Sequence, residues 1–238
     1  MGRRVATTLA VGFLLVLGGC SLLGEEGSGV LVTRDLVLSG EVDEIVVGHA
    51  FEAAVTVGGT GAPAASVTID DNLTDLLRFE QDERTLRVEL DGRVRNATLQ
   101  VRIALPSLVA VQASDAATVT VEGPVVGERI RVEASDASVV EIAELDVDDL
   151  EIRASGASRV ECAGRADEID AEASGASDLP LGGLAASRAR IDVSGASSAE
   201  VDVEDELIAS ASGASTVRYH GTPDTSVESS GASTVAPI

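Results

Sequence analysis

The sequence predicts an all-β protein whose C-terminal half is a right-handed parallel β-helix, a solenoid of stacked coils. The tetrapeptide Ala-Ser-Gly-Ala, or a close variant, recurs seven times at intervals of 18–21 residues. Apolar and polar residues alternate on both sides of each copy, which is the pattern of a half-buried strand. The variation in repeat length falls in one segment of each repeat, as expected of a loop between constant strands.

The repeated tetrapeptide is predicted to form the corner of each coil. We number each repeat from its first serine, position 0. Position +1 is then Gly in five copies and Asp in two, and both residues tolerate a positive φ better than most. The corner serines are Ser114, Ser135, Ser155, Ser174, Ser194, Ser212 and Ser230, and the corner glycines are Gly156, Gly175, Gly195, Gly213 and Gly231.

Two short strands are expected to flank each corner. Positions −5 and −3 before it, and +5 and +7 after it, are mostly apolar, while −4 and +6 are mostly polar. Stacked coils place equivalent positions above one another at about 4.8 Å. Position +3 is a serine in six of the seven copies. If buried, these hydroxyls are expected to bond each other or the corner backbone, since an unpaired buried hydroxyl costs about 1–3 kcal/mol. Cys162 falls in the inward +7 column, which predicts an inert core thiol.

Residues 30–107 lack the corner motif but contain alternating stretches typical of strands, at 51–57, 85–90 and 97–103. Residues 71–77 predict one helical turn capped by Asp71 or Asn72. We expect this N-terminal β region to supply irregular coils and to cap the stack, because an open end exposes unpaired strand edges. Residues 108–238 are then the seven-coil solenoid.

The first residues resemble the signal of a bacterial lipoprotein. Arg3 and Arg4 precede an apolar run, residues 5–17, which is too short to span a bilayer comfortably. The run ends in Leu17-Gly18-Gly19-Cys20, which is similar to a lipobox. The resemblance implies cleavage before Cys20 and a diacylglyceryl group on its thiol. The alternative is an ordinary signal peptide that happens to end beside a cysteine.

This reading divides the N-terminus into a signal peptide, residues 1–19, and a flexible tether, residues 20–29. The mature chain is expected to be anchored by lipid in a cell membrane or outer membrane, on the extracellular or periplasmic side. If Cys20 carries lipid, Cys162 is the only other cysteine, so the sequence predicts no intramolecular disulfide and no cysteine metal site.

Composition argues against several functions. The formal net charge is −23, and every basic residue is arginine, so we expect no binding to nucleic acid. Aromatic residues make up only 2% and Trp is absent, which leaves little to stack against a sugar ring. His49 and His220 are isolated in the sequence, and no nucleophile-elbow, phosphate-loop, dinucleotide-binding or zinc motif occurs. We therefore expect no catalytic residues and no enzyme.

Two acidic stretches are the remaining candidates for a bound ligand. Carboxylate-rich loops can hold Ca²⁺, but neither stretch matches an EF-hand or the glycine-rich nonapeptide calcium repeat, and a solvated acidic face is the favoured explanation of both. The candidate residues are Glu144, Asp146, Asp148 and Asp149 in the first stretch and Asp202, Glu204, Asp205 and Glu206 in the second. No other cofactor is expected.

The chain also resembles the family described as "putative auto-transporter adhesin, head GIN domain" over about residues 45–238. The resemblance rests on the repeated Ser-Gly-Ala-Ser and on four further stretches, which are Asp71-Asn72-Leu73, Thr85-Leu86-Arg87-Val88, Leu105-Pro106-Ser107-Leu108 and Arg218-Tyr219-His220-Gly221-Thr222-Pro223. It implies an exported β-helical protein and supplies no catalytic residues.

The combined expectation is a non-catalytic cell-envelope lipoprotein whose β-helical surface binds an envelope or surface protein or a glycan. Two alternatives remain open. One is a carbohydrate-active β-helix enzyme, because some parallel β-helices cleave polysaccharides. The other is a structural spacer stiffened by calcium.

Overall fold

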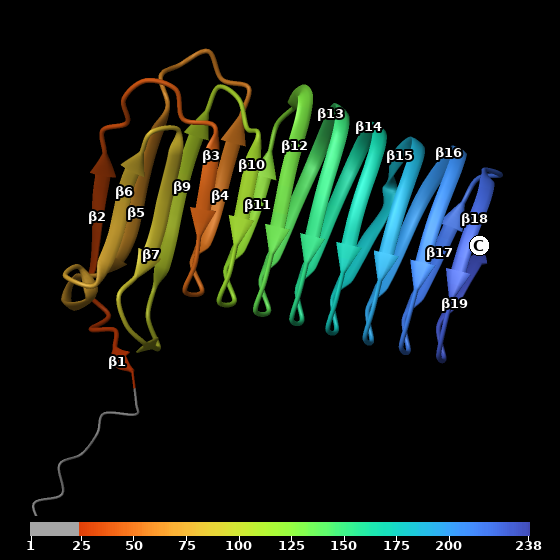
Figure 1. Ribbon diagram of the computed structural model, residues 1–238. Helices are drawn as coiled ribbons and strands as arrows, with labels where there is room; N and C mark the ends of the chain where they lie inside the picture. The colour runs from red at the N-terminus through yellow and green to blue at the C-terminus, as the bar shows by residue number, and fades with distance from the viewer. Residues whose placement is uncertain (1–23) are drawn as a thin grey trace, which may run out of the picture.

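The computed structural model describes residues 24–238, which form one elongated β-solenoid (Figure 1). The strands at the N-terminal end are β1 (Glu25–Glu26), β2 (Leu31–Leu36), β3 (Glu44–Val47), β4 (Glu52–Val57), β5 (Ala64–Asp70), β6 (Leu77–Asp82), β7 (Thr85–Leu90), β8 (Val94–Arg95) and β9 (Leu99–Leu105). The repeats form β10 (Ala110–Ala113), β11 (Thr118–Glu122), β12 (Val125–Ala134), β13 (Val139–Ala154), β14 (Arg159–Ala173), β15 (Asp178–Val193), β16 (Ser198–Ala211), β17 (Thr216–His220), β18 (Asp224–Ser229) and β19 (Thr234–Pro237). Within residues 24–238, no helix is long and apolar enough to cross a membrane.

The parallel solenoid predicted from the repeats is confirmed. Each strand from β10 onward pairs in parallel with its equivalent in the next coil, as in Val119 with Val140 and Val140 with Val160. Seven motif corners therefore bound six complete turns. The apolar columns face inward and are almost fully buried, because alternate side chains of a strand point to opposite faces.

The loop predicted on the third side of each coil is wrong for the four middle turns, whereas the first and the last turn have a short break in the strand, at residues 123–124 and 221–223. Strand β13 runs without interruption from one corner to the next, and β14, β15 and β16 do the same. The differences in repeat length appear instead as shifts of register within the strands, for example between Ile142 and Leu145. A bulge absorbs an extra residue while the neighbouring backbone groups keep their partners, so hydrogen bonding favours a bulged strand over a loop.

An eighth corner, which the sequence does not reveal, precedes the motif corners. Strands β3 and β4 pair in parallel with β10 and β11, so Gly48–Phe51 stacks on Ser114–Ala117. His49 and Ala50 have φ of 56° and 58°, close to 51° and 64° at Asp115 and Ala116. The backbone conformation is thus shared although the residues differ.

The remaining N-terminal strands close this end of the rod (Figure 1). Strands β7 and β9 stack in parallel on β3 and β4, and β6, β5 and β2 then add in antiparallel orientation. The chain thus leaves the stack after β4, builds the outer layers and returns as β10 on the other side of β3. Spatial order and sequence order therefore differ in this part.

The helical turn predicted for residues 71–77 is shorter and differently capped. A 3-10 turn covers only Asp71–Leu73, its N-cap is Asp70, and no side chain caps it. The Asp70 carboxylate is buried and instead accepts hydrogen bonds from the amides of Gly29 (2.6 Å) and Thr98 (2.7 Å). The Asp70 side chain therefore connects two segments that are distant in sequence and does not cap the 3-10 turn that follows it.

The flexible tether predicted for residues 20–29 is docked from Gly24 onward. Strand β1 pairs in parallel with β8, and the side-chain amide of Asn72 donates to the carbonyl of Glu26 at 2.9 Å. A Cβ on Gly24 would lie 2.5 Å from the carbonyl oxygen of Arg93, so the backbones are in close contact. Polar composition suggested flexibility, but these polar groups are used in hydrogen bonds.

Candidate functional site

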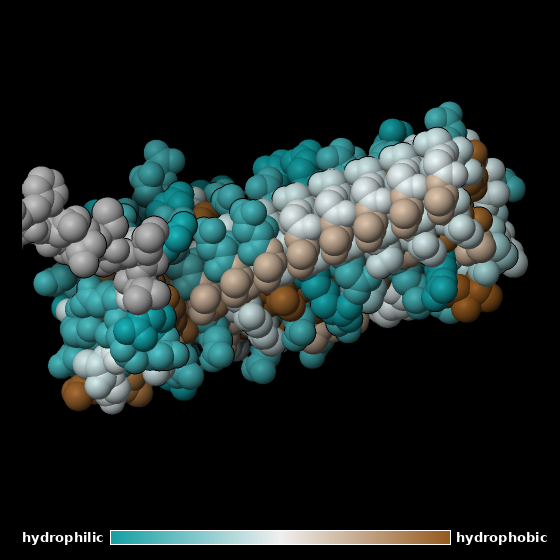
Figure 2. Space-filling model, turned by 90° about the horizontal axis from the view of Figure 1, so that it is seen from below, coloured by the Kyte–Doolittle hydropathy of each residue, from teal (hydrophilic) through white to brown (hydrophobic). Residues whose placement is uncertain are grey.

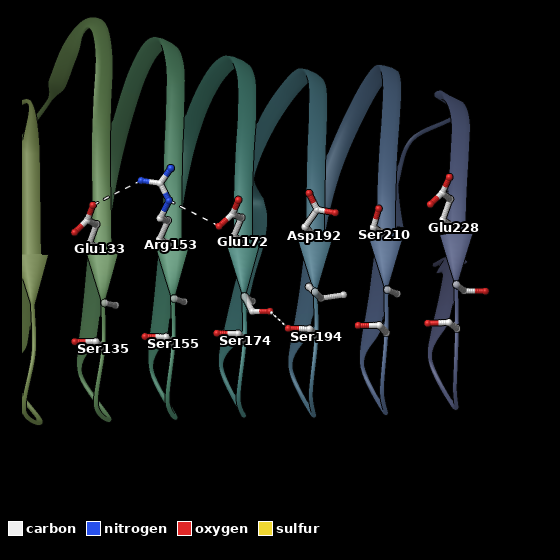
Figure 3. A pocket seen from close by; sticks show the side chains of 18 of the residues that line it. Glu133, Ser135, Arg153, Ser155, Glu172, Ser174, Asp192, Ser194, Ser210 and Glu228 are labelled. Atoms are coloured by element: carbon white, nitrogen blue, oxygen red, sulfur yellow. Dashed lines mark hydrogen bonds and ion pairs between the residues drawn. The ribbon is translucent and has the colours of Figure 1, made fainter.

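A groove of about 800 Å³ runs along the rod beside the corners and crosses consecutive coils (Figure 3). Positions −2, −1 and 0 of the repeats line it, from Gln112 in β10 to Ser230 after β18. The corners next to it form a pale band of small residues along the molecule (Figure 2). We call this feature the corner groove.

The corner groove arises from a step in side-chain size. Positions −2 and 0 point to the same side of the strand, and the residue between them points into the core. The long side chains at −2 form a wall, the serines at 0 leave space beside it, and the buried residues at −1 provide the floor. The wall consists of Gln112, Glu133, Arg153, Glu172, Asp192, Ser210 and Glu228.

Four residues of the wall are acidic and one, Arg153, is basic. The guanidinium of Arg153 lies 3.8 Å from the carboxylates of both Glu133 and Glu172 (Figure 3), and 2.6 Å from Glu151, which is on its own strand. Glu133 and Glu172 occupy the same position as Arg153 in the two neighbouring coils. Ion pairs between side chains this exposed contribute less than about 1 kcal/mol each. The wall residues therefore affect the charge of the groove more than the stability of the fold.

The two serine columns have different roles. The serines at position +3 are buried, and the hydroxyls of Ser158, Ser177 and Ser215 donate to the position-0 carbonyl of their own corner at 2.7–2.9 Å. Those at position 0 point outward. Within residues 24–238, the hydroxyls of Ser135, Ser155, Ser174, Ser212 and Ser230 bond no protein atom. The corner groove therefore offers hydroxyls that a ligand can use.

Neither histidine reaches the corner groove. His220, the last residue of β17, lies 3.3 Å from Glu200, and His49 accepts a hydrogen bond of 3.4 Å from the amide of Leu90. The serines of the groove thus have no histidine beside them, so the Ser–His pair of many serine hydrolases is not formed there. The arrangement can hold a ligand through hydrogen bonds and carboxylate contacts.

The calcium candidates do not gather into a metal site. Among the described residues, no group of three or more Asp, Glu, His or Cys side chains could hold an ion. Arginines compensate several of these acids instead. Asp149 pairs with Arg129 at 2.8 Å. The pKa of the Arg165 guanidinium is raised mainly by Asp167 and to a smaller extent by Asp146 and Glu204.

The second acidic stretch contributes to another hollow. Asp202 and Glu204 line a groove of about 570 Å³ together with Arg165. Glu206 stacks beside Arg188 in the neighbouring coil. A positive charge already lies next to the acids, which opposes binding of a second cation.

Cys162 is a buried free thiol, as the +7 column predicted. Burial, with a smaller contribution from Glu161, raises the pKa of this thiol to about 12. Because the thiolate is the reactive form, we expect folded protein carrying Cys20→Ser to resist iodoacetamide at pH 8. The same protein in concentrated urea should react at the rate of a free cysteine. Mass spectrometry measures the alkylation, and rapid modification of the folded protein would contradict this prediction.

Cys20 and residues 1–19 lie outside the described part of the chain.

The fold occurs in solved structures with low sequence identity. A structure described as a "putative adhesin" from Bacteroides fragilis superposes with a TM-score of 0.84 at 22% identity and covers 90% of this chain and 100% of its own. A "putative adhesin" from Parabacteroides distasonis gives 0.70 at 24% identity, with 90% and 99% covered. A "putative lipid binding protein" from the same species gives 0.72 at 19%, with 90% and 98% covered.

No protein of curated function is detectably similar to this chain. A family profile, in contrast, matches residues 41–223, which is more than three quarters of the sequence and includes the motifs quoted above. The resemblance noted in the sequence is thereby confirmed. The chain belongs to the family described as "Putative auto-transporter adhesin, head GIN domain".

Proposed function

We propose that the protein is a non-catalytic cell-envelope lipoprotein, anchored through Cys20, whose corner groove binds a polymeric ligand of the envelope. The family description and the similarity to structures described as adhesins support a role in adhesion. The observation that carries the proposal is the repetition of one outward hydroxyl and one longer polar side chain in each of several consecutive coils.

A repeating surface of this kind suits a repeating or extended ligand. Identical positions recur along the rod at about 4.8 Å, so each unit of a glycan or an extended polypeptide meets similar groups. The wall has four carboxylates and one guanidinium, so it attracts hydrogen-bond donors and repels polyanions. Protein and glycan ligands are separated by the experiment below.

The test is co-sedimentation of the lipid-free mature chain, residues 21–238, with purified cell envelopes. We expect saturable binding that Ser174→Gln combined with Ser212→Gln weakens at least roughly tenfold, because larger side chains fill the groove without entering the core. Treating the envelopes with protease or with glycan-degrading enzymes identifies the ligand class.

The matched control places the same side chains on the other side of the corner. Thr216 and Thr234 at position +4 lie outside the corner groove, so Thr216→Gln combined with Thr234→Gln should bind like the unmodified chain. Equal affinity of both double variants, or no binding to any envelope fraction, would overturn the proposal.

A further inference from the structure

The docked N-terminal segment fixes where the chain leaves the folded rod. The amide of Glu25 donates to the Arg93 carbonyl at 2.8 Å, and that of Gly27 donates to the Arg95 carbonyl at 3.1 Å. Glu26 also forms an ion pair of 2.6 Å with Arg95. The backbone is thus held against the N-terminal end of the solenoid from Gly24, and Figure 1 shows β1 at this end of the rod.

Very little chain remains between this docked segment and the proposed anchor. Only residues 21–23 separate Cys20 from Gly24. Four residue steps span at most about 14 Å even when fully extended. A diacylglyceryl group on Cys20 would therefore keep the N-terminal end of the rod close to the lipid headgroups.

This same end carries apolar side chains that the fold does not bury. Val30, Leu31 and Val37 are 58%, 52% and 91% exposed. They lie at the two ends of β2, which is the last strand of the antiparallel layers and the outermost one at this end in Figure 1. The last coil at the opposite end of the rod also exposes two apolar residues, Val227 and Ile238, but that end lies far from the docked N-terminal segment. We call Val30, Leu31 and Val37 the end face.

We propose that the end face contacts the lipid headgroup region, so that the rod stands end-on at the membrane surface. This inference rests on the Cys20 anchor of the proposed function. Apolar residues at such an interface enter about 5–10 Å into the headgroup and acyl boundary. The strong negative charge of the chain opposes contact with anionic lipid, so the contact is to a zwitterionic lipid surface.

An end-on rod has a direct consequence for the corner groove. The groove begins at Gln112 in β10, next to the N-terminal layers, and extends to Ser230 in the last coil. It would therefore run away from the membrane, with the Glu228 end projecting farthest. A rod lying flat would instead hold the whole groove at one height above the lipid.

The absence of Trp from the sequence makes the contact measurable with single reporters. The full chain, exported and lipidated, is purified with Leu31→Trp or Val37→Trp and reconstituted into phosphatidylcholine vesicles with brominated acyl chains. Because bromine quenches indole only at short range, we expect fluorescence to fall roughly twofold relative to unbrominated vesicles, given an insertion depth of about 5–10 Å. Circular dichroism verifies that each variant is folded.

Two control reporters use exposed apolar positions away from the end face. Val126 and Ile238, which are 67% and 63% exposed, lie in β12 and at the far end of the rod. Val126→Trp and Ile238→Trp should not be quenched. Quenching of the controls, or vesicle-bound protein without quenching at positions 31 and 37, would overturn the end-on contact while leaving the anchor intact.

Failure of the anchor gives a different result. Cys20→Ser should abolish both the mass increase from the lipid and sedimentation with vesicles. If the unmodified chain carries no lipid and stays in the supernatant, the anchor of the proposed function is wrong and the end-on contact loses its basis.

Discussion

Replacing Gly195 by Ala is expected to lower the free energy of unfolding by about 3 kcal/mol or more. Gly195 has φ of +75°, where an L side chain costs about 1–2 kcal/mol. A Cβ there would also lie 2.5 Å from the carbonyl oxygen of Gly175. That oxygen accepts a hydrogen bond of 2.8 Å from the amide of Ala196, so it cannot move away without breaking the contact between coils. Urea unfolding followed by circular dichroism measures the loss.

Gly40→Ala separates the two causes of this destabilisation. Gly40 has a similar φ of +68°, but nothing lies within 4 Å of the Cβ position. It should therefore show only the conformational penalty of about 1–2 kcal/mol. If both variants lower the free energy of unfolding by the same amount, close packing between corner backbones is not the reason for glycine at position 195.

Replacing Asp70 by Ala is expected to detach the N-terminal segment from the rod. The buried carboxylate accepts short hydrogen bonds from two amides, those of Gly29 and Thr98. Each bond to a charged group contributes about 1.5–3 kcal/mol, so the two together account for roughly 3–6 kcal/mol of local stability. Hydrogen exchange at the two amides should accelerate strongly, while amides in β14 and β15 should keep their protection, since solenoid coils contact mainly their neighbours.

Asp71→Ala is the matched control for this prediction. Asp71 is exposed and accepts one side-chain hydrogen bond, from the hydroxyl of Ser28. Its loss should cost less than about 1 kcal/mol. Unchanged exchange at Gly29 and Thr98 in the Asp70→Ala variant would show that strand pairing alone docks the segment. The lipid contact inferred above would then not depend on this carboxylate.

The repeats made the solenoid predictable. A corner motif at nearly constant spacing, with period-two alternation around it, places the same residue type at the same point of each coil. Parallel stacking of equivalent positions is then the arrangement that buries every apolar column at once. The inward Cys162 and the buried serines at position +3 followed from the same periodicity, because alternate side chains of a strand point to opposite faces.

The corners show the limit of that reasoning. In sequence, Asp115 and Asp136 seem to replace the corner glycines. In the structure, the alanine after each Asp also has a positive φ, whereas those after the glycines do not. Two turn types therefore occur in one column, one with two residues of positive φ at the Asp corners and one with a single positive φ at the Gly corners. Gly156, the first glycine of the column, lies against the backbone of Asp136, and a contact between corners of this kind has no local sequence signal.

The sequence by itself determined the fold class, the register of the repeats and the family, because each depends on a local pattern repeated many times. Only the tertiary structure decided the eighth corner, the reordered stacking of β3, β7 and β10, the docking of residues 24–29 and the corner groove. Each of these depends on a single contact between segments distant in sequence, such as Asp70 with Gly29, or on the difference in side-chain size between stacked neighbours. The eighth corner, the reordered stacking and the docked segment arise once in the chain, so no periodicity reports them, whereas the groove recurs in every coil but depends on how large the stacked side chains are relative to one another.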